Sequence, residues 1–135
     1  MSDDSSSGAR PDVELRLPAD GAYASVLRTT TAGLAARLEF TMDDIEDLRI
    51  AIGEASAMVL PDADPASDLT CLYYLEPRRM TIEVAVDAAE PPEPDLDSFA
   101  WQVLSTLAAQ AEVLTDGGRL RVRLTMESSL AGAGL

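Results

Sequence analysis

Glu54 is the residue of this sequence with the best claim to chemistry. It lies in the string IGEASAM, late in a stretch from Thr41 to Leu60 whose apolar residues recur at three- and four-residue steps. That spacing predicts a helix, with Thr41 as its N-cap, Asp44 three residues on, and Pro61 ending it. A carboxylate at Glu54 could act as a general base, or it could be an ordinary surface charge. Composition alone favours the surface charge, since glutamate is almost never buried unpaired.

Composition excludes several other chemistries. The 135 residues are enough for one domain, and they contain no histidine, which removes the usual general base, the commonest zinc ligand and any Ser-His-Asp triad. The single cysteine, Cys71, excludes an internal disulfide framework and suits a reducing cytoplasm. It falls on the inward side of an expected strand, so a buried thiol is favoured over a redox switch.

Charge and hydropathy limit the kinds of partner that the protein can have. The formal net charge of −14 argues against direct nucleic-acid binding and favours a basic partner surface or simple solubility. No run approaches the roughly 18 apolar residues that would span a membrane. The polar N-terminus has no apolar signal segment, so we expect a cytoplasmic protein.

The elements that must position Glu54 follow from the same periodicities. Alternation predicts five strands, at about 13–17, 69–75, 80–86, 111–114 and 120–126. Helical spacing predicts three helices, at about 21–40, 41–60 and from Asp95 or Asp97 to about 107. This order predicts an α+β two-layer sandwich, a mostly antiparallel sheet covered on one face by three helices. We expect a domain over 12–127, a disordered N-terminal tail over 1–11 and a flexible C-terminal tail over 128–135.

The same patterns predict which side chains face the core. The apolar side of the first helix is expected to comprise Tyr23, Val26, Leu27, Leu34 and Leu38. That of the third helix is expected to comprise Leu96, Phe99, Val103, Leu104 and Leu107, with Trp101 on its edge. In the last strand Arg119, Arg121 and Arg123 alternate with apolar residues, and we interpret them as a solvated sheet face rather than a phosphate site.

The element order and the string TMDDIEDLRIAIGEA resemble the anti-sigma factor family of SpoIIAB and RsbW. Members are small serine kinases with the GHKL (Bergerat, histidine-kinase-like) ATPase fold. The resemblance runs from VELRL to LRVRLTMES, and the third helix, SFAWQVLSTLA, is most similar to that of the shorter actinobacterial members. It implies the Bergerat fold in a shortened form.

Carried onto this chain, the family's nucleotide motifs are only partly present. Glu54 matches the glutamate of the E-x-x-x-N motif, but the asparagine that holds Mg²⁺ is replaced by Met58, a poor ligand for a cation that demands oxygen. Asp87 matches the aspartate that hydrogen-bonds adenine. The glycines that follow it in the family are Ala89 and Pro91 here, which restrict close backbone approach.

The second glycine motif of the family falls on Ser98 and Ala100, at the start of the third helix. The segment before it, EPPEPD, is shorter than the family's ATP lid and acidic, so it would repel phosphates. The helix N-terminus at Ser98 could still offer backbone donors to an anion. The resemblance therefore implies a degenerate site without a cofactor, with Mg-ATP as the alternative.

Partner binding does not need the nucleotide. Arg28 aligns with the first-helix arginine that, in the family, contacts both the sigma factor and the anti-anti-sigma (STAS) antagonist; on composition alone it would be a solvated surface residue. The resemblance implies a non-catalytic or weakly catalytic anti-sigma factor that binds an alternative sigma factor, and a homodimer, with no contact to nucleic acid or membrane. A kinase of the antagonist, with Glu54 as base and Asp87 at adenine, is the alternative. A third possibility is an interaction domain that acts on something other than a sigma factor.

Overall fold

The computed structural model describes residues 10–130 and contains one five-stranded sheet. Its strands are β1 (Val13–Pro18), β2 (Asp68–Glu76), β3 (Arg79–Asp87), β4 (Gln110–Asp116) and β5 (Arg119–Glu127). The helices are α2 (Ala24–Ala36), α3 (Met42–Val59) and α4 (Phe99–Leu107), with short 3₁₀ turns η1 (Gly21–Tyr23) and η2 (Leu60–Asp62). Neighbouring strands are antiparallel throughout, in the order β1-β2-β3-β5-β4.

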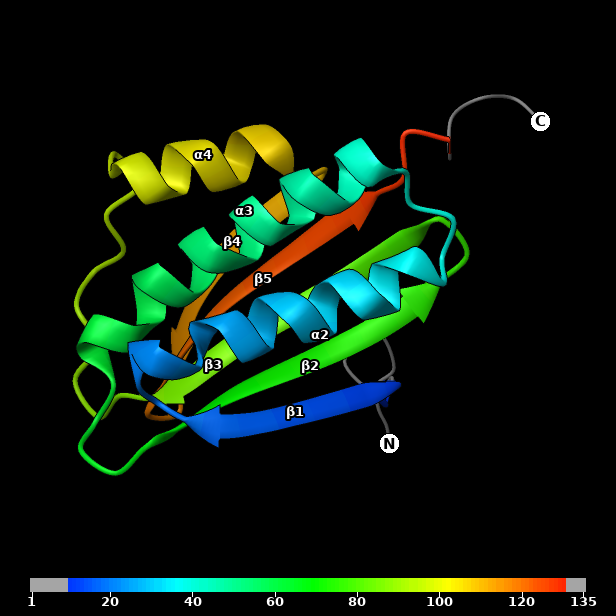
Figure 1. Cartoon of the computed structure of the whole chain (residues 1–135). Coiled ribbons are helices and arrows are strands. Elements are labelled where there is room, and N and C mark those ends of the chain that lie inside the picture. Colours follow the sequence, from blue (N-terminus) through cyan, green and yellow to red (C-terminus); the bar gives the residue numbers. More distant parts are fainter. Residues whose placement is uncertain (1–9, 131–135) are drawn as a thin grey trace.

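The helices form one layer over one face of the sheet, with α3 between α2 and α4 (Figure 1). This confirms the predicted two-layer α+β sandwich. The two hairpins are the parts that the sequence predicts best. The inward side chains of β2 and β3, from Leu69 to Tyr73 and from Met80 to Val86, are almost fully buried, as alternation requires. Gly117 and Gly118, both at positive φ, make the β4–β5 turn that the sequence predicts.

The start of α3 has the expected cap and an unexpected second role. The Thr41 hydroxyl accepts a hydrogen bond from the Asp44 amide, and the Asp44 carboxylate accepts one from the Thr41 amide, which is a complete capping box. The Asp44 carboxylate also accepts bonds from the Ser129 amide at 2.9 Å and from the hydroxyls of Ser128 and Ser129. Ser128 and Ser129, which fall in the expected C-terminal tail, are therefore held against the start of α3.

Asp44→Ala is expected to lower the free energy of unfolding by about 1.5 kcal/mol, because it removes the cap and the acceptor for Ser129. Burial acts to raise the pKa of Asp44, but the hydrogen bonds from Thr41 and Ser129 outweigh it and hold that pKa below its ordinary value. A carboxylate whose pKa is lowered by folding contributes stability that is fully present above its unfolded-state pKa of about 4. This stability is lost as the pH falls from there through the lower pKa of the folded state. Urea unfolding of both proteins at neutral and acid pH measures this.

Asp43→Ala is the matched control, since Asp43 lies in the same first turn but is exposed. It is expected to change the unfolding free energy by no more than about 0.5 kcal/mol. Equal losses for the two variants, or a loss at Asp44 that does not shrink in acid, would contradict the proposed stabilising role of the Asp44 hydrogen bonds.

The core lies between the helices and the sheet. The α3 face built from Leu48, Ile52, Ala55 and Val59 is fully buried, as its spacing predicts. Cys71 is 1 % exposed on the inward side of β2, and burial raises the pKa of its thiol to about 12.

Cys71 should therefore not react with a thiol reagent in the native protein at mildly alkaline pH, because the thiolate that reacts is not formed. In the native protein, we expect Cys71 to be labelled no faster than the protein unfolds. In denaturant, labelling is expected to be fast. Rapid native-state labelling, followed by mass spectrometry, would show that β2 opens locally.

Several predicted core residues are instead exposed. Tyr23 in η1 and Val26 on α2 are 39 % and 42 % exposed. The face of α2 that is buried is a narrow stripe of Leu27, Thr31 and Ala35. The buried Thr31 hydroxyl is satisfied within the core: it donates to the Leu27 carbonyl and lies 2.7 Å from the Tyr73 hydroxyl in a second hydrogen bond.

At the start of α4 and just before it, Phe99 and Leu96 are 76 % and 55 % exposed, so their prediction as core is also wrong. The helix begins later than expected: Ser98, not Asp95 or Asp97, is the N-cap, and its hydroxyl accepts from the Trp101 amide. Leu96 thus precedes the helix, and only Leu104 is fully buried, with Trp101 and Leu107 packed beside it.

The arginines of β5 are not simply solvated. Arg123 donates to Glu83 at 2.8 Å, while Arg121 lies 3.6 Å from Glu83 and donates to Asp116 at 2.9 Å. Glu83 is only 6 % exposed, although it lies on the sheet face opposite the helices. The prediction that this face is not a phosphate site fits these pairs, because the arginines already have carboxylate partners.

No helix within residues 10–130 has the length and apolar character that a membrane crossing would require. The expected disordered tail over 1–11 falls almost entirely on residues 1–9, which lie outside the described part of the chain, as do 131–135 of the expected C-terminal tail.

Candidate functional site

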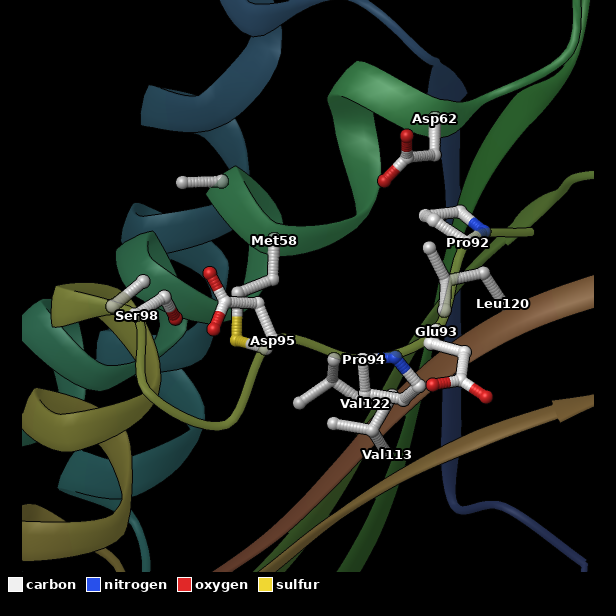
Figure 2. Close-up of a pocket in the computed structure, with 12 residues that line it drawn as sticks. Met58, Asp62, Pro92, Glu93, Pro94, Asp95, Ser98, Val113, Leu120 and Val122 are labelled. Carbon is white, nitrogen blue, oxygen red and sulfur yellow. The ribbon is translucent and has the colours of Figure 1, made fainter.

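A cavity of about 330 Å³ lies where the last turn of α3, the loop before α4 and the inner side of β4 and β5 meet (Figure 2). It is the place where the resemblance puts the nucleotide, since Met58 and Ser98 both line it. The remaining lining residues are Ala57, Asp62, Pro92, Glu93, Pro94, Asp95, Ala100, Val113, Leu120 and Val122.

The cavity combines an apolar floor with acidic side chains. Val113, Leu120 and Val122 rise from the two C-terminal strands, and the Met58 thioether comes from α3 (Figure 2). Three of the lining side chains are carboxylates, Asp62 after α3 and Glu93 and Asp95 in the loop. None of the cavity's lining residues in the described part of the chain is basic.

Ser98 has little to offer an anion. Its hydroxyl is used by the Trp101 amide at 3.1 Å, and its own amide donates to the Asp95 carbonyl. The Asp95 carboxylate in turn accepts from the Asp97 amide at 3.0 Å. Two carboxylates therefore stand before the N-terminus of α4 and offset the positive end of its dipole.

These residues do not fit Mg-ATP. A triphosphate would meet Asp62, Glu93 and Asp95, and none of the arginines of the described chain lines the cavity. Within residues 10–130, no group of three acidic, cysteine or histidine side chains is placed to hold a metal ion. Met58 offers sulfur at the place where the resemblance expects an oxygen ligand for magnesium.

The other two predicted nucleotide residues do not line the cavity. Glu54 is half-buried on α3, one turn before Met58. Asp87 ends β3 with its carboxylate mostly exposed and 3.9 Å from Arg119, on the side of the sheet away from the helices. The structure thus brings Ser98 and Met58 together and leaves Glu54 and Asp87 outside.

Arg28 lies at a separate place on the helical layer. Its side chain is half-buried and runs over α3 at Gly53, where an added Cβ would sit 3.7 Å from one guanidinium nitrogen. Among residues 10–130 no carboxylate forms an ion pair with it. The arginine is therefore held by packing while its charge stays available.

Sequence reasoning anticipated the acidity of the 90–95 loop but missed Asp62. That residue lies in the turn PDADP, where acids are ordinary turn formers. The only indication in the sequence was that Asp62 directly follows Pro61, the residue predicted to end α3. Only the folded structure places Asp62 beside Glu93 and Asp95.

Comparison with known proteins supports the expected relationship. No protein-family model matches the chain. The serine-protein kinase RsbW of Bacillus cereus is 37 % identical over 75 residues, covering 54 % of this chain and 47 % of that protein. The serine-protein kinase RsbW of Bacillus thuringiensis is 36 % identical over 75 residues with the same coverage. The chain thus spans about half the length of the curated relatives that it matches.

A solved structure extends the likeness to most of the fold. The crystal structure of the RsbU and RsbW domains of Rv1364c from Mycobacterium tuberculosis aligns with a TM-score of 0.66 at 16 % identity. It covers 87 % of this chain and 33 % of that one. At such low identity the match establishes the fold alone, and it confirms the predicted architecture.

Proposed function

We propose that this chain, an RsbW-like domain, sequesters an alternative sigma factor by binding alone and is displaced from it by a STAS-type anti-anti-sigma protein. The similarity to RsbW proteins supports this kind of partner. The carboxylate-lined cavity supports the non-catalytic part of the proposal, because its lining has three carboxylates and no basic side chain. In this proposal the chain regulates transcription by covering a surface of the sigma factor.

Charge and geometry favour a basic partner. The net charge of −14 would speed association with a protein that carries basic surfaces for DNA and polymerase. Arg28, packed on Gly53 and without an ion pair among residues 10–130, is the residue we assign to the contact. A planar guanidinium can form two parallel hydrogen bonds to a partner carboxylate, which gives the contact its geometric specificity.

The test is transcription reconstituted from purified core polymerase and each alternative sigma factor of the source organism. We expect the chain to suppress transcripts of one alternative sigma factor, to leave the primary sigma factor active, and to lose its effect when the cognate STAS protein is added. Suppression should need no nucleotide. Failure to inhibit any sigma factor would favour the third possibility, an interaction domain with another target.

Calorimetric titration with Mg-ATP separates the non-catalytic protein from the kinase. We expect no saturable heat, while a cooperative melt shows that the protein is folded. Micromolar binding, together with phosphorylation of the STAS protein that is lost in Glu54→Ala, would instead establish the kinase. In that case Glu54 and Asp87 would have the roles that the resemblance implies.

Homodimerisation and a cytoplasmic location belong to the same proposal. The location follows from the partner-switching role, because an anti-sigma factor must meet its sigma factor in the compartment of transcription. The homodimer is what the resemblance to the anti-sigma family implies. Light scattering of the purified chain measures the assembly state directly: a dimer mass is expected, and a monomer mass would remove this part of the proposal.

A further inference from the structure

We propose that Arg49 is a second contact residue for the sigma factor, and that Arg28 and Arg49 together receive a partner helix with two carboxylates one turn apart. The inference rests on the proposed function and adds the chemistry of the partner segment. We call the residues involved the arginine surface: Arg28 on α2 with Arg49, Ile50 and Gly53 on α3. They lie where α2 and α3 run side by side in the helical layer (Figure 1).

The two arginines meet α3 one helical turn apart. The Arg28 side chain runs over Gly53, where an added Cβ would sit 3.7 Å from a guanidinium nitrogen and 3.9 Å from Cδ. Arg49 precedes Gly53 by one turn on the same helix. Residues with this spacing lie on one helix face, about 6 Å apart. The two helices therefore present two positive charges to the same part of the protein surface.

Neither arginine has a carboxylate partner among residues 10–130. Most of the other arginines in this part of the chain form an ion pair: Arg16, Arg78, Arg119, Arg121 and Arg123. Arg79 is aligned with Glu76 and Glu127 on the neighbouring strands. Arg28 and Arg49 are half-buried, so each has lost part of its hydration without gaining a charged partner within the described chain.

The surroundings of these arginines are poor in acidic residues, although the protein contains 24 of them. The sequence of α2 has none. On α3, Glu46 lies one turn before Arg49 but is exposed and forms no ion pair with it, and helical spacing places Asp47 and Glu54 toward the other side of the helix. The arginine surface is thus positive on a strongly negative protein, which would orient a partner that the net charge attracts.

The spacing of the charges determines what the partner has to offer. A guanidinium binds a carboxylate through two parallel hydrogen bonds, and acidic residues one turn apart on a helix are separated by about 6 Å, as Arg49 and Gly53 are. Ile50, which is 42 % exposed and lies three residues before Gly53, adds an apolar contact beside the charges. A nucleic acid would also attract arginines, but the net charge of −14 repels a polyanion.

Arg49→Glu tests the second contact, and Arg37→Glu, at an exposed position that is also without an ion pair in the described chain, is its control. Surface plasmon resonance at high salt should show sigma-factor binding weakened at least about tenfold by Arg49→Glu and unchanged by Arg37→Glu. If the unmodified chain binds no sigma factor, the proposed function fails and this inference falls with it. If the unmodified chain binds and the two variants behave alike, the inference alone is wrong.

Gly53→Asp tests the charge of Arg28 while leaving both arginines in place, because it offers Arg28 a carboxylate within the same chain. The space at Gly53 accepts a side chain without a close contact, and the fold should tolerate the change. We expect binding at least about fivefold weaker for Gly53→Asp and at most about twofold weaker for Gly53→Asn, which has the same shape without the charge. Equal effects of the two substitutions would show that the charge of Arg28 does not hold the partner and would overturn the inference.

Discussion

Truncating Leu104 to alanine is expected to lower the free energy of unfolding by about 3 kcal/mol. Leu104 is completely buried and is the one fully buried side chain of α4, a nine-residue helix that cannot be stable by itself. Its removal leaves a cavity under α4 and weakens the attachment of that helix to the sheet. The midpoint of urea unfolding, with the slope unchanged, measures the loss.

Phe99→Ala is the matched control on the same helix. Phe99 is the larger side chain, but it is 76 % exposed, so its truncation should change stability by no more than about 0.5 kcal/mol. If Phe99→Ala proves as damaging as Leu104→Ala, α4 must pack through the face that its sequence spacing first indicated.

Arg28→Glu is expected to weaken binding of the sigma factor at least about 30-fold, which corresponds to a contact of about 2 kcal/mol at the centre of an interface. The substitution replaces a charge available for a partner carboxylate with one that repels it. The fold should survive, because Arg28 is only half-buried and lies against Gly53 rather than in the core. Surface plasmon resonance on the purified pair gives the affinity.

Arg37→Glu controls for the change in net charge, since Arg37 is exposed at the C-terminal end of the same helix. It should weaken binding only through long-range electrostatics, and that effect should vanish at high salt. Equal losses for the two variants at high salt would mean that Arg28 is not a specific contact.

The sequence predicts best where one physical rule acts alone. The face of the β2–β3 hairpin that meets the helices follows from alternation alone, although on β3 Glu83 and Ala85 of the opposite face are buried as well. The Thr41–Asp44 cap is equally local, since both partners lie within one turn. The element order and the family resemblance also gave the architecture correctly.

The errors arise where tertiary packing chooses between possible faces. Thr31 is buried because Tyr73, 42 residues later, supplies a partner for its hydroxyl, and no local pattern announces this. Phe99 fits the apolar period of α4, yet the cap at Ser98 turns it toward solvent. The acidic cavity is another such case, since it needs the end of α3 to meet a loop some 30 residues further along the chain.

The bonds between Asp44 and Ser129 also constrain how the chain is made. They join groups 85 residues apart, so the carboxylate that caps α3 obtains its last donors only after almost the whole described chain has been synthesised. While the protein is still on the ribosome, the first turn of α3 has to form with the local cap alone. Closing such a distant contact costs more loop-closure entropy than forming the local cap. A nascent chain that stops before Ser129 would hold α3 less firmly, and with it the end of the helical layer next to the C-terminus of β5.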